Sequence, residues 1–345
     1  MRRFFAFTVT LGLGVLAVLI WLAPVWNVAD LFRQFWAPLT LAAILAALTV
    51  VIFGKKRLRW IAPVLAIMVA LPGLGEVWRS VAAAPPTSGG GPDITIVTHN
   101  LWGRNTSPVS AATRLTALDA DIVALQEAFG TAWTVPDLLS EDYPYRADCE
   151  NYASTIVSRL EITDSGCLDW WWWRTLDGHR DADFFHAPPA AWATIRLADG
   201  GFITVVSVHM TWPDPLRHQN DQRRGLARLL SAFPQDRLIV MGDFNASSPS
   251  SALSRFDRDL GLRRITRGIA TWPSQSLWNN RFGVTPPVPT MMTGIDHIFV
   301  GEDVLGWEVQ RGPDTGSDHR PIWARIFLTP LGMQEAGPVP QELRD

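Results

Sequence analysis

Hydrophobic residues are distributed unevenly along the chain. Before Pro92 the sequence is almost entirely apolar, and it contains three long apolar runs, Phe4 to Ala23, Ala37 to Phe53 and Trp60 to Val77. The first run is about 20 residues long, which is enough for a helix to cross a hydrocarbon core of ~30 Å. The pattern therefore predicts three transmembrane helices, at about 4–23, 37–53 and 60–77, in an anchor over residues 1–79.

Two of these runs have an alternative interpretation. Arg2 and Arg3 resemble the charged start of a secretory signal peptide, although the apolar stretch is long and no clear small-residue cleavage site follows it. The third run contains Pro63 and Pro72, and its alternative is a re-entrant segment. Whether the third run crosses the membrane or is re-entrant determines on which side of the membrane the rest of the chain lies.

Positive charges flank the apolar runs in two places. Arg2 and Arg3 precede the first run, and the segment GKKRLR, with both lysines of the chain, follows the second. Positively charged loops stay in the cytoplasm, which places the N-terminus there. Three crossings then predict a multi-pass protein of the inner or plasma membrane whose large domain is periplasmic or extracellular. A re-entrant third run would leave that domain in the cytoplasm.

Beyond the apolar region the pattern changes. Residues 80–92 are rich in proline, glycine and small residues, which predicts a flexible linker. From residue 93 the chain has short buried-strand patterns such as DITIVTHN, DIVALQE, GFITVVSVHM and RLIVMGDFN, and helical patterns such as RHQNDQRRGLARLLSAF. Several strands follow one another without a helix, which favours mixed sheets with helices outside. We expect one domain over residues 93–330 and a tail over residues 331–345.

Polar residues gather where the predicted strands end. The clusters are His99–Asn100, Glu127, His209, Gly242–Asn245, Asp296–His297 and Ser317–His319. A single polar residue at a strand end is usually a turn former or a cap. So many clusters in one domain favour a shared site instead.

These clusters lie in motifs that resemble a known family. THNLW, LQE, SVHMTWP, GDFNAS, IDHIFV and GSDHRPI are similar to the signatures of the endonuclease/exonuclease/phosphatase superfamily, in the same order, from about Asp93 to Pro330. The family shares its fold with pancreatic deoxyribonuclease. The resemblance implies an α/β (α+β) fold, a four-layer sandwich of two mixed β-sheets flanked by helices, with the site at one edge.

The resemblance also implies a metal and a water-activating group. Asn100 and Glu127 would hold Mg²⁺ or Mn²⁺, ions that prefer hard oxygen ligands. Asp243 would orient or activate the attacking water, and Asn245 would hold a phosphoryl oxygen.

The remaining motif residues would form the acid–base part of the site. Asp318 and His319 would form a carboxylate–imidazole pair at the phosphorus, and His209 would be the other catalytic histidine. Asp296 would orient one of the histidines, and the sequence leaves open which one. Together these groups would position a phosphate ester and stabilise its charge, which is most of what phosphoryl transfer needs.

A tryptophan-rich segment follows the strand pattern YASTIVSR. It contains WWWW at residues 170–173, and we take Trp171, Trp173 and Arg174 as candidates for substrate or lipid contact, with Asn151 as a further polar candidate. The alternative for the tryptophans is ordinary packing on a sheet. Tryptophan favours the membrane interface, because its ring is apolar and its N–H is polar.

The cysteines and the charge balance bear on compartment and partner. Cys149 and Cys167 flank one predicted strand and would form a disulfide in an oxidising compartment, or stay as free thiols in a cytosol. After Pro92 the acidic residues outnumber the arginines, whereas binding to duplex DNA normally relies on a basic patch.

The leading hypothesis is a membrane-anchored, metal-dependent phosphohydrolase that acts outside the cytoplasm on a lipid-linked phosphate or pyrophosphate. The anchor makes the lipid bilayer itself a partner. The second hypothesis is a membrane-tethered nuclease acting on DNA or RNA, which the same motifs would serve. The third is a non-catalytic envelope adaptor, which the complete set of motif residues disfavours.

Overall fold

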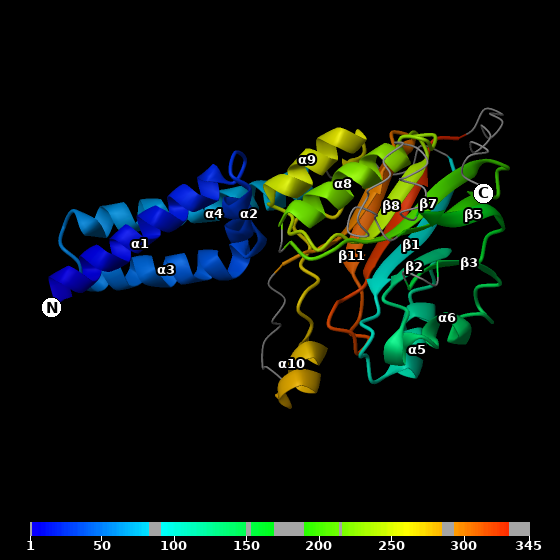
Figure 1. Cartoon of the computed structure of the whole chain (residues 1–345), viewed down its shortest axis with the longest axis horizontal. Helices are drawn as coiled ribbons and strands as arrows, with labels where there is room; N and C mark the ends of the chain where they lie inside the picture. Colours follow the sequence, from blue (N-terminus) through cyan, green and yellow to red (C-terminus); the bar gives the residue numbers. More distant parts are fainter. Residues whose placement is uncertain are drawn as a thin grey trace.

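The computed structural model in Figure 1 has an elongated helical bundle at one end and a larger α/β domain at the other. It describes residues 2–82, 91–149, 153–168, 190–213, 216–284 and 293–330. Asn151, Trp171, Trp173 and Arg174 lie outside the described residues, so their expected roles stay predictions.

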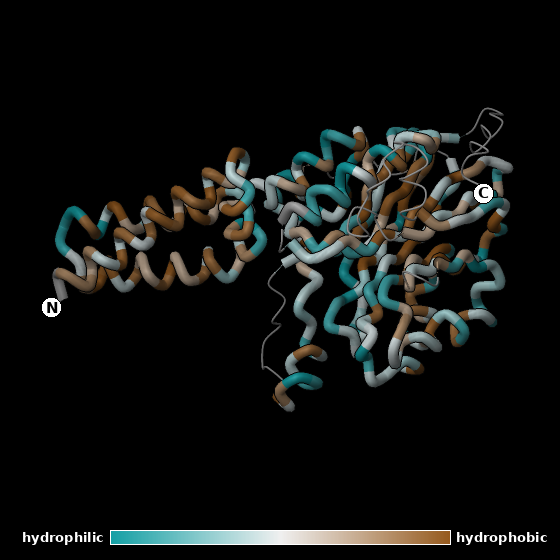
Figure 2. Tube along the Cα trace, in the orientation of Figure 1, coloured by the Kyte–Doolittle hydropathy of each residue, from teal (hydrophilic) through white to brown (hydrophobic). Residues whose placement is uncertain are grey.

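The N-terminal bundle consists of α1 (Arg2–Leu22), α2 (Asn27–Gln34), α3 (Trp36–Phe53) and α4 (Leu58–Ala82). Three of these helices, α1, α3 and α4, are long and apolar enough to cross a membrane. Small and branched residues such as Ala17, Val50 and Val69 are buried between them. Large hydrophobic side chains such as Leu11, Leu45 and Val64 are also exposed on the outside of the bundle, which is typical of helices that face lipid. Figure 2 shows in brown that most residues along these helices are hydrophobic.

Helix α4 departs from expectation in its length. It contains Pro63 and Pro72 but continues to Ala82, so residues 80–82, which we expected in the linker, are helical. Helix α4 is closely packed just after its second proline, at Gly73. Any side chain at this position would clash with Trp36, because a Cβ atom would lie 1.8 Å from Trp36 Cε2. The Trp36 ring therefore packs directly on the α4 backbone, and its indole donates a hydrogen bond to the Ala70 carbonyl, 3.1 Å away.

Two six-stranded sheets form the α/β domain. The first has the order β11 (Val304–Arg311), β12 (Ile322–Leu328), β1 (Asp93–Asn100), β2 (Ile122–Gln126), β4 (Ser154–Ser158) and β3 (Tyr145–Cys149). The second has the order β5 (Ile162–Leu168), β6 (Ala190–Arg196), β7 (Phe202–His209), β8 (Leu238–Asp243), β10 (Asp296–Val300) and β9 (Arg263–Arg264). Both sheets are mixed: β1 and β2 run parallel, as do β7 and β8, and the other neighbouring strands are antiparallel.

The sheets face each other across the main core, which includes Ile96 and Ile156 from the first sheet and Val205 and Met241 from the second. Helices cover the two outer faces. On the first sheet these are α5 (Pro108–Thr116), η1 (Gly130–Ala132) and α6 (Val135–Leu138); on the second they are α8 (Leu216–Leu230) and α9 (Ser251–Leu260). A further helix, α10 (Gln275–Phe282), projects from the domain (Figure 1). The four-layer sandwich of two mixed sheets flanked by helices is confirmed.

A disulfide joins the edges of the two sheets. Cys149 at the end of β3 is bonded to Cys167 in β5, with 5.5 Å between the Cα atoms. The bond therefore connects the last strand of the first sheet to the first strand of the second.

The bundle and the α/β domain meet through buried polar contacts. Both carboxylate oxygens of Asp30 in α2 accept hydrogen bonds from the first backbone N–H groups of α9, those of Ser251 and Ala252, at 2.7 and 2.9 Å. A negative charge stabilises a helix N-terminus, because the helix dipole is positive there. Helix α2, which the sequence analysis did not predict, thus serves as a docking element for the domain.

Helix α4 contributes a second docking contact. Glu76 Oε2 accepts hydrogen bonds from Arg264 Nη2 at 3.0 Å and from Arg267 Nη1 at 2.7 Å. The side chains of Glu76 and Arg264 are only 3% and 0% exposed, and Asp257 pairs with both arginines from the other side. The charges are therefore compensated within the interface between bundle and domain.

Candidate functional site

The expected motif residues come together at one end of the two sheets because of the strand register. In the second sheet, Asp243 at the end of β8 is opposite His209 of β7 on one side and Asp296 of β10 on the other. In the first sheet, Asn100 at the end of β1 is opposite Gln126, the residue before Glu127. The carboxyl ends of both parallel strand pairs thus open on the same site.

Asn100 links the two sheets across this site. Its amide donates hydrogen bonds to Glu127 Oε1 at 3.0 Å and to Asp243 Oδ2 at 2.9 Å. Glu127 also accepts a hydrogen bond from the Gly103 backbone at 3.0 Å, and its own backbone has a φ of +54°. Such a left-handed conformation is costly for a residue with a side chain and often marks a functional position. Burial would raise the pKa of Glu127, but His209, the Asn100 amide and the Gly103 N–H outweigh it and lower this pKa.

Asp243 lies at the centre of the site and is almost fully buried. Burial, together with the nearby Asp296 carboxylate, raises the pKa of Asp243 to about 6, although His319 acts in the opposite direction. Asn245 donates to Asp243 twice, from its backbone at 2.8 Å and from its amide at 3.3 Å. The same amide donates to the Met210 carbonyl at 2.7 Å. We expected Asn245 to hold a phosphoryl oxygen, but its amide is engaged with Asp243 and the Met210 carbonyl.

The carboxylate–imidazole pair differs from expectation. His319 Nδ1 is 2.9 Å from Asp296 Oδ2, whereas Asp318 Oδ1 lies 3.9 Å from the other ring nitrogen, outside hydrogen-bond range. The partner of His319 is therefore Asp296, which answers the question of which histidine Asp296 orients. Thr271 holds Asp296 by donating a hydrogen bond to the same carboxylate oxygen.

The carboxylates of Asp296 and Asp243 control the protonation of His319. Burial alone would lower the pKa of His319, but Asp296 and Asp243 outweigh it and hold this pKa well above its usual value. The pKa of Asp318 is also raised, because the effect of burial exceeds the lowering effect of the nearby His319. The site thus places a protonated imidazole beside a carboxyl group of raised pKa, Asp243, with His319 Nε2 3.7 Å from Asp243 Oδ2.

The other histidines occupy different environments. His209 Nε2 lies 3.6 Å from Glu127 Oε1 and 3.8 Å from Asp243 Oδ2, and its side chain is 22% exposed. His99 is buried and bonds to the Thr315 hydroxyl, and burial lowers its pKa to about 3. His297 is buried between the Thr266 hydroxyl and the Ala246 carbonyl. His209 and His319 thus face the site, whereas His99 and His297 stabilise the surrounding loops.

The donor set of the site suits a divalent cation. The carboxylates of Glu127, Asp243, Asp296 and Asp318 gather here, and in the described part of the chain their charged neighbours in ion pairs are only histidines, with no arginine or lysine. Among the described residues, Asp296 Oδ1 and Asp318 Oδ1 are buried without a hydrogen-bond partner. Ligand atoms of Asp243, Asp296 and His319 lie within 4.8 Å of one another, but a protonated His319 has no lone pair for a metal, which leaves the carboxylate oxygens as ligands. An excess of buried carboxylate oxygens without thiols fits Mg²⁺ or Mn²⁺.

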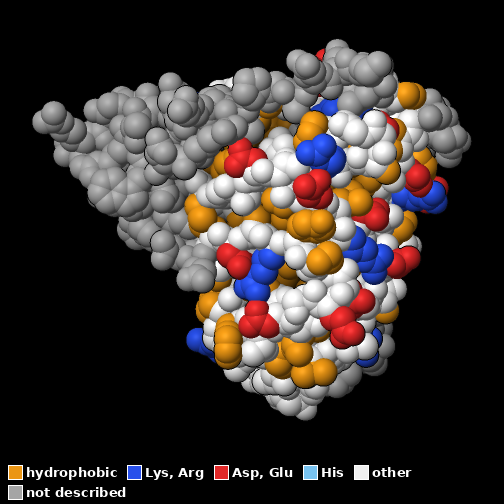
Figure 3. Space-filling model, turned by 90° about the vertical axis from the view of Figure 1, so that its right-hand side faces the viewer, with side chains coloured by type: hydrophobic (Ala, Val, Ile, Leu, Met, Phe, Trp, Pro, Cys, Tyr) orange, Lys and Arg blue, Asp and Glu red, His pale blue; other side chains and the backbone are white. Residues whose placement is uncertain are grey.

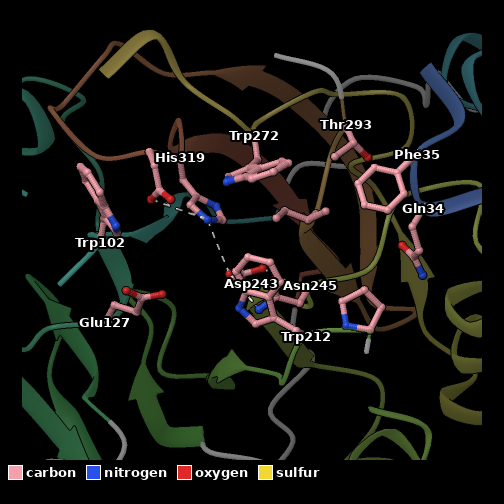
Figure 4. Close-up of a pocket in the computed structure, with 13 residues that line it drawn as sticks. Gln34, Phe35, Trp102, Glu127, Trp212, Asp243, Asn245, Trp272, Thr293 and His319 are labelled. Carbon is pink, nitrogen blue, oxygen red and sulfur yellow. Dashed lines mark hydrogen bonds and ion pairs between the residues drawn. The ribbon is translucent and has the colours of Figure 1, made fainter. Parts of the chain in front are cut away.

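The site opens into a cavity of about 250 Å³ (Figure 4). Asp243, Asn245, Glu127, Asp318 and His319 line it, and so do residues that the sequence analysis did not single out: Gln34, Phe35, Trp102, Trp212, Pro213, Trp272, Thr293 and Ile295. Trp102 and Trp212 belong to the motifs THNLW and SVHMTWP. Their position shortly after the motif histidines could have indicated that they line the site. Gln34 and Phe35 come from the N-terminal bundle and carried no such signal.

Comparison with known proteins places the chain in a family. The model of the Endonuclease/Exonuclease/phosphatase family matches residues 97–319. The match covers more than half of the chain and every candidate catalytic or metal-binding residue named above, from Asn100 to His319, so the chain belongs to the endonuclease/exonuclease/phosphatase family. Its general class is thus a phosphohydrolase of that family. A search of curated proteins finds no match.

Solved structures agree on the fold. An endonuclease/exonuclease/phosphatase from Bacteroides vulgatus is 18% identical with a TM-score of 0.52, covering 69% of this chain and 100% of its own. SmcL is 16% identical with a TM-score of 0.52, and the match covers 68% of this chain and 99% of SmcL. Truncated TDP2 from Caenorhabditis elegans is 12% identical with a TM-score of 0.50, and the match covers 70% of this chain and 100% of the truncated TDP2 chain. At these identities the likeness concerns the α/β fold alone.

Proposed function

We propose that this protein is a membrane-anchored, metal-dependent phosphohydrolase that acts outside the cytoplasm on a lipid-linked phosphate or pyrophosphate. The observation that carries the proposal is the position of the cavity. It has the family's motif residues in its wall together with Gln34 and Phe35 from the end of the bundle. A reactive site whose wall includes residues that directly precede a candidate membrane helix is suited to a substrate that resides in the membrane.

The residues of the site would divide the work of hydrolysis between them. Asp243, with its pKa raised to about 6, would accept a proton from the attacking water near neutral pH. His319, kept protonated by Asp296, would donate a proton or hydrogen bond on the phosphoryl side. Asn100 and Glu127 would hold the Mg²⁺ or Mn²⁺, which supplies positive charge to the phosphoryl oxygens.

The bundle supports the membrane part of the proposal. Its three long helices place hydrophobic side chains outward along their length, and Trp26 and Trp78 are exposed at the end that meets the domain. Tryptophan is enriched at membrane interfaces. In Figure 1 the N-terminus and the α3–α4 loop, which carries Lys55 and Lys56, lie at the opposite end. With that basic loop in the cytoplasm, the α/β domain would face the periplasm or the cell exterior.

A tethered nuclease is the alternative function for the same motifs. On the face turned away from the bundle, Figure 3 shows arginine and acidic side chains interspersed in the part that is coloured by type. Duplex nucleic acid is bound chiefly through clustered positive charge, so this face offers little support for a nuclease. A non-catalytic adaptor fits less well, since His319, Asp243 and Glu127 are oriented toward one cavity.

A substrate panel tests the proposal. The full chain, purified in detergent, would be given Mg²⁺ and either a polyprenyl pyrophosphate, a phospholipid or plasmid DNA. Released phosphate, the phosphomonoester formed from the phospholipid, or strand breaks would be measured. We expect activity on a lipid substrate that EDTA removes and added Mg²⁺ restores, and none in the His319→Ala variant. Cleavage of plasmid with no action on either lipid would overturn the lipid assignment in favour of the nuclease.

A further inference from the structure

The corner between α2 and α3 forms one wall of the cavity. Gln34 is the last residue of α2 and Phe35 follows it directly. In Figure 4 these two side chains lie on one side of the cavity and Trp102 and Glu127 on the other, with His319, Asp243 and Asn245 between them. The wall therefore borders the same cavity as the reacting groups.

Gln34 has a buried donor without a hydrogen-bond partner in the described part of the chain. Its side-chain oxygen accepts a hydrogen bond from the Ser247 backbone at 2.6 Å, just beyond Asn245. Gln34 is 4% exposed, and its Nε2 has no hydrogen-bond partner among the described residues. A buried amide N–H without a partner is costly. Gln34 lines the cavity but its Nε2 atom is covered, so a ligand oxygen reaches this donor when the side chain turns toward the cavity.

Phe35 adds an apolar surface beside that donor. Its side chain is 52% exposed although it lines the cavity, and the exposed ring of Trp212 lines the same cavity together with Pro213 and Ile295. Phe35 directly precedes α3, one of the helices able to cross a membrane. The apolar side of the cavity thus adjoins the surface that would meet the bilayer, which suits a ligand whose hydrocarbon begins next to its phosphate.

We propose that Gln34 and Phe35 form a substrate-binding subsite for the chain-bearing side of a lipid phosphoester. This inference rests on the proposed function and extends it to residues of the anchor. The Gln34 amide donates to a non-reacting oxygen of the phosphoester, and the Phe35 ring packs against the first carbons of the lipid chain. The substrate then enters from the bilayer at the α2–α3 corner; Gln34 contributes affinity for the phosphoester, and Phe35 determines specificity for lipid over soluble esters.

Two esters that differ only in their chain test the subsite. Hexadecyl p-nitrophenyl phosphate and methyl p-nitrophenyl phosphate have the same leaving group, so their kcat/KM values can be compared in mixed micelles with Mg²⁺ and the full chain. We expect the wild type to prefer the hexadecyl ester. Phe35→Ala should lower the hexadecyl-to-methyl ratio roughly tenfold, the effect of losing the packing of a few methylene groups. Phe35→Leu should recover most of the preference.

Phe53 provides a matched control. It lies at the opposite end of α3 and is 51% exposed, so Phe53→Ala removes a similar ring that faces away from the cavity. We expect its ester ratio to equal that of the wild type. Gln34→Glu keeps the acceptor for Ser247 but replaces the donor with a negative oxygen, and it should raise KM for both esters without changing their ratio.

The outcomes separate this inference from the proposed function. A wild type that prefers the hexadecyl ester, with Phe35→Ala keeping the full preference, overturns the subsite and leaves the lipid phosphohydrolase standing. Equal loss of the preference in Phe35→Ala and Phe53→Ala means that membrane contact in general is responsible, which also overturns it. A wild type without any preference overturns the lipid assignment and the subsite together, as does a lack of metal-dependent cleavage of both esters.

Discussion

The buried carboxylate of Glu76 allows a direct test of how firmly the bundle holds the α/β domain. Glu76→Gln keeps the size of the side chain and removes its charge. In the wild type, Glu76 Oε2 accepts hydrogen bonds from Arg264, Arg267 and the Ser248 hydroxyl. The substitution therefore takes a negative charge away from two guanidinium groups at the interface.

The expected magnitude follows from burial and from the charges that remain. Breaking a buried ion pair by removing one partner costs about 3–5 kcal/mol, because the other charge stays buried. Asp257 still faces both arginines in the variant, at 3.1 Å from Arg264 Nε and 2.6 Å from Arg267 Nη2. We therefore take the lower end and expect Glu76→Gln to reduce the free energy of unfolding by about 3 kcal/mol.

Chemical denaturation of the full chain in mixed micelles would measure this loss. A double-mutant cycle with Arg267→Gln should give a coupling of about 0.5–3 kcal/mol, the range for residues in one ion-pair network. Arg79→Gln is the control, since Arg79 also pairs with Glu76 but its side chain is 62% exposed. Exposed pairs contribute about 0–1 kcal/mol. Equal effects of Glu76→Gln and Arg79→Gln would refute the idea that buried charge holds this interface together.

Three further predictions concern the site, the bundle and the disulfide. Asp296→Asn removes a carboxylate that raises the pKa of His319, so kcat/KM should fall roughly 10²–10⁴-fold. The alkaline limb of the pH profile of kcat/KM should move to lower pH, because His319 then loses its proton more readily. An alkaline limb at the wild-type pH would contradict the pairing of His319 with Asp296. Gly73→Leu should cost about 1–3 kcal/mol of unfolding free energy through its clash with Trp36, whereas Gly75→Leu in the same helix, with open space around its Cβ position, should cost less. Reducing the disulfide, whose cysteines are 18 residues apart, should lower the free energy of unfolding by about 3 kcal/mol, and reductant should not affect a variant with both cysteines replaced by serine.

The strands that the sequence predicts well are those in the middle of the sheets. β2, β8 and β10 are buried on both faces, so they appear in the sequence as short continuous apolar runs. The edge strands β3 and β11 are exposed over much of their length and contain polar residues, so their pattern resembles that of a loop. Their strand conformation depends on pairing with a neighbour that lies elsewhere in the sequence.

The helices show a similar division. Apolar length alone indicates α1, α3 and α4, whereas α2 is short and lies between two apolar runs. Helix α9 did carry local signals that the sequence analysis passed over: Ser250 caps its first turn, and Gly261 ends it with a φ of +69°.

In the site, the motifs identify the residue types but not their partners. Asp296 rather than Asp318 bonds to His319, and this choice follows from the pairing of β10 with β8, which places Asp296 opposite Asp243. The contribution of Gln34 to the cavity depends on docking between segments that are 213 residues apart, as in its bond to Ser247. No local pattern encodes such a contact.

The position of β12 constrains the order in which the protein can be built. β12 is the last of the described strands, yet it lies inside the first sheet and pairs with β1, the first described strand of the domain, with Asp93 opposite Phe327. During synthesis the three apolar helices are complete long before β12 exists. The first sheet therefore stays open along β1 until the ribosome has synthesised residues 322–328, and an unpaired strand edge is prone to wrong pairing. A chain truncated before Ile322 would keep its bundle but lose an interior strand of the sheet that carries Asn100.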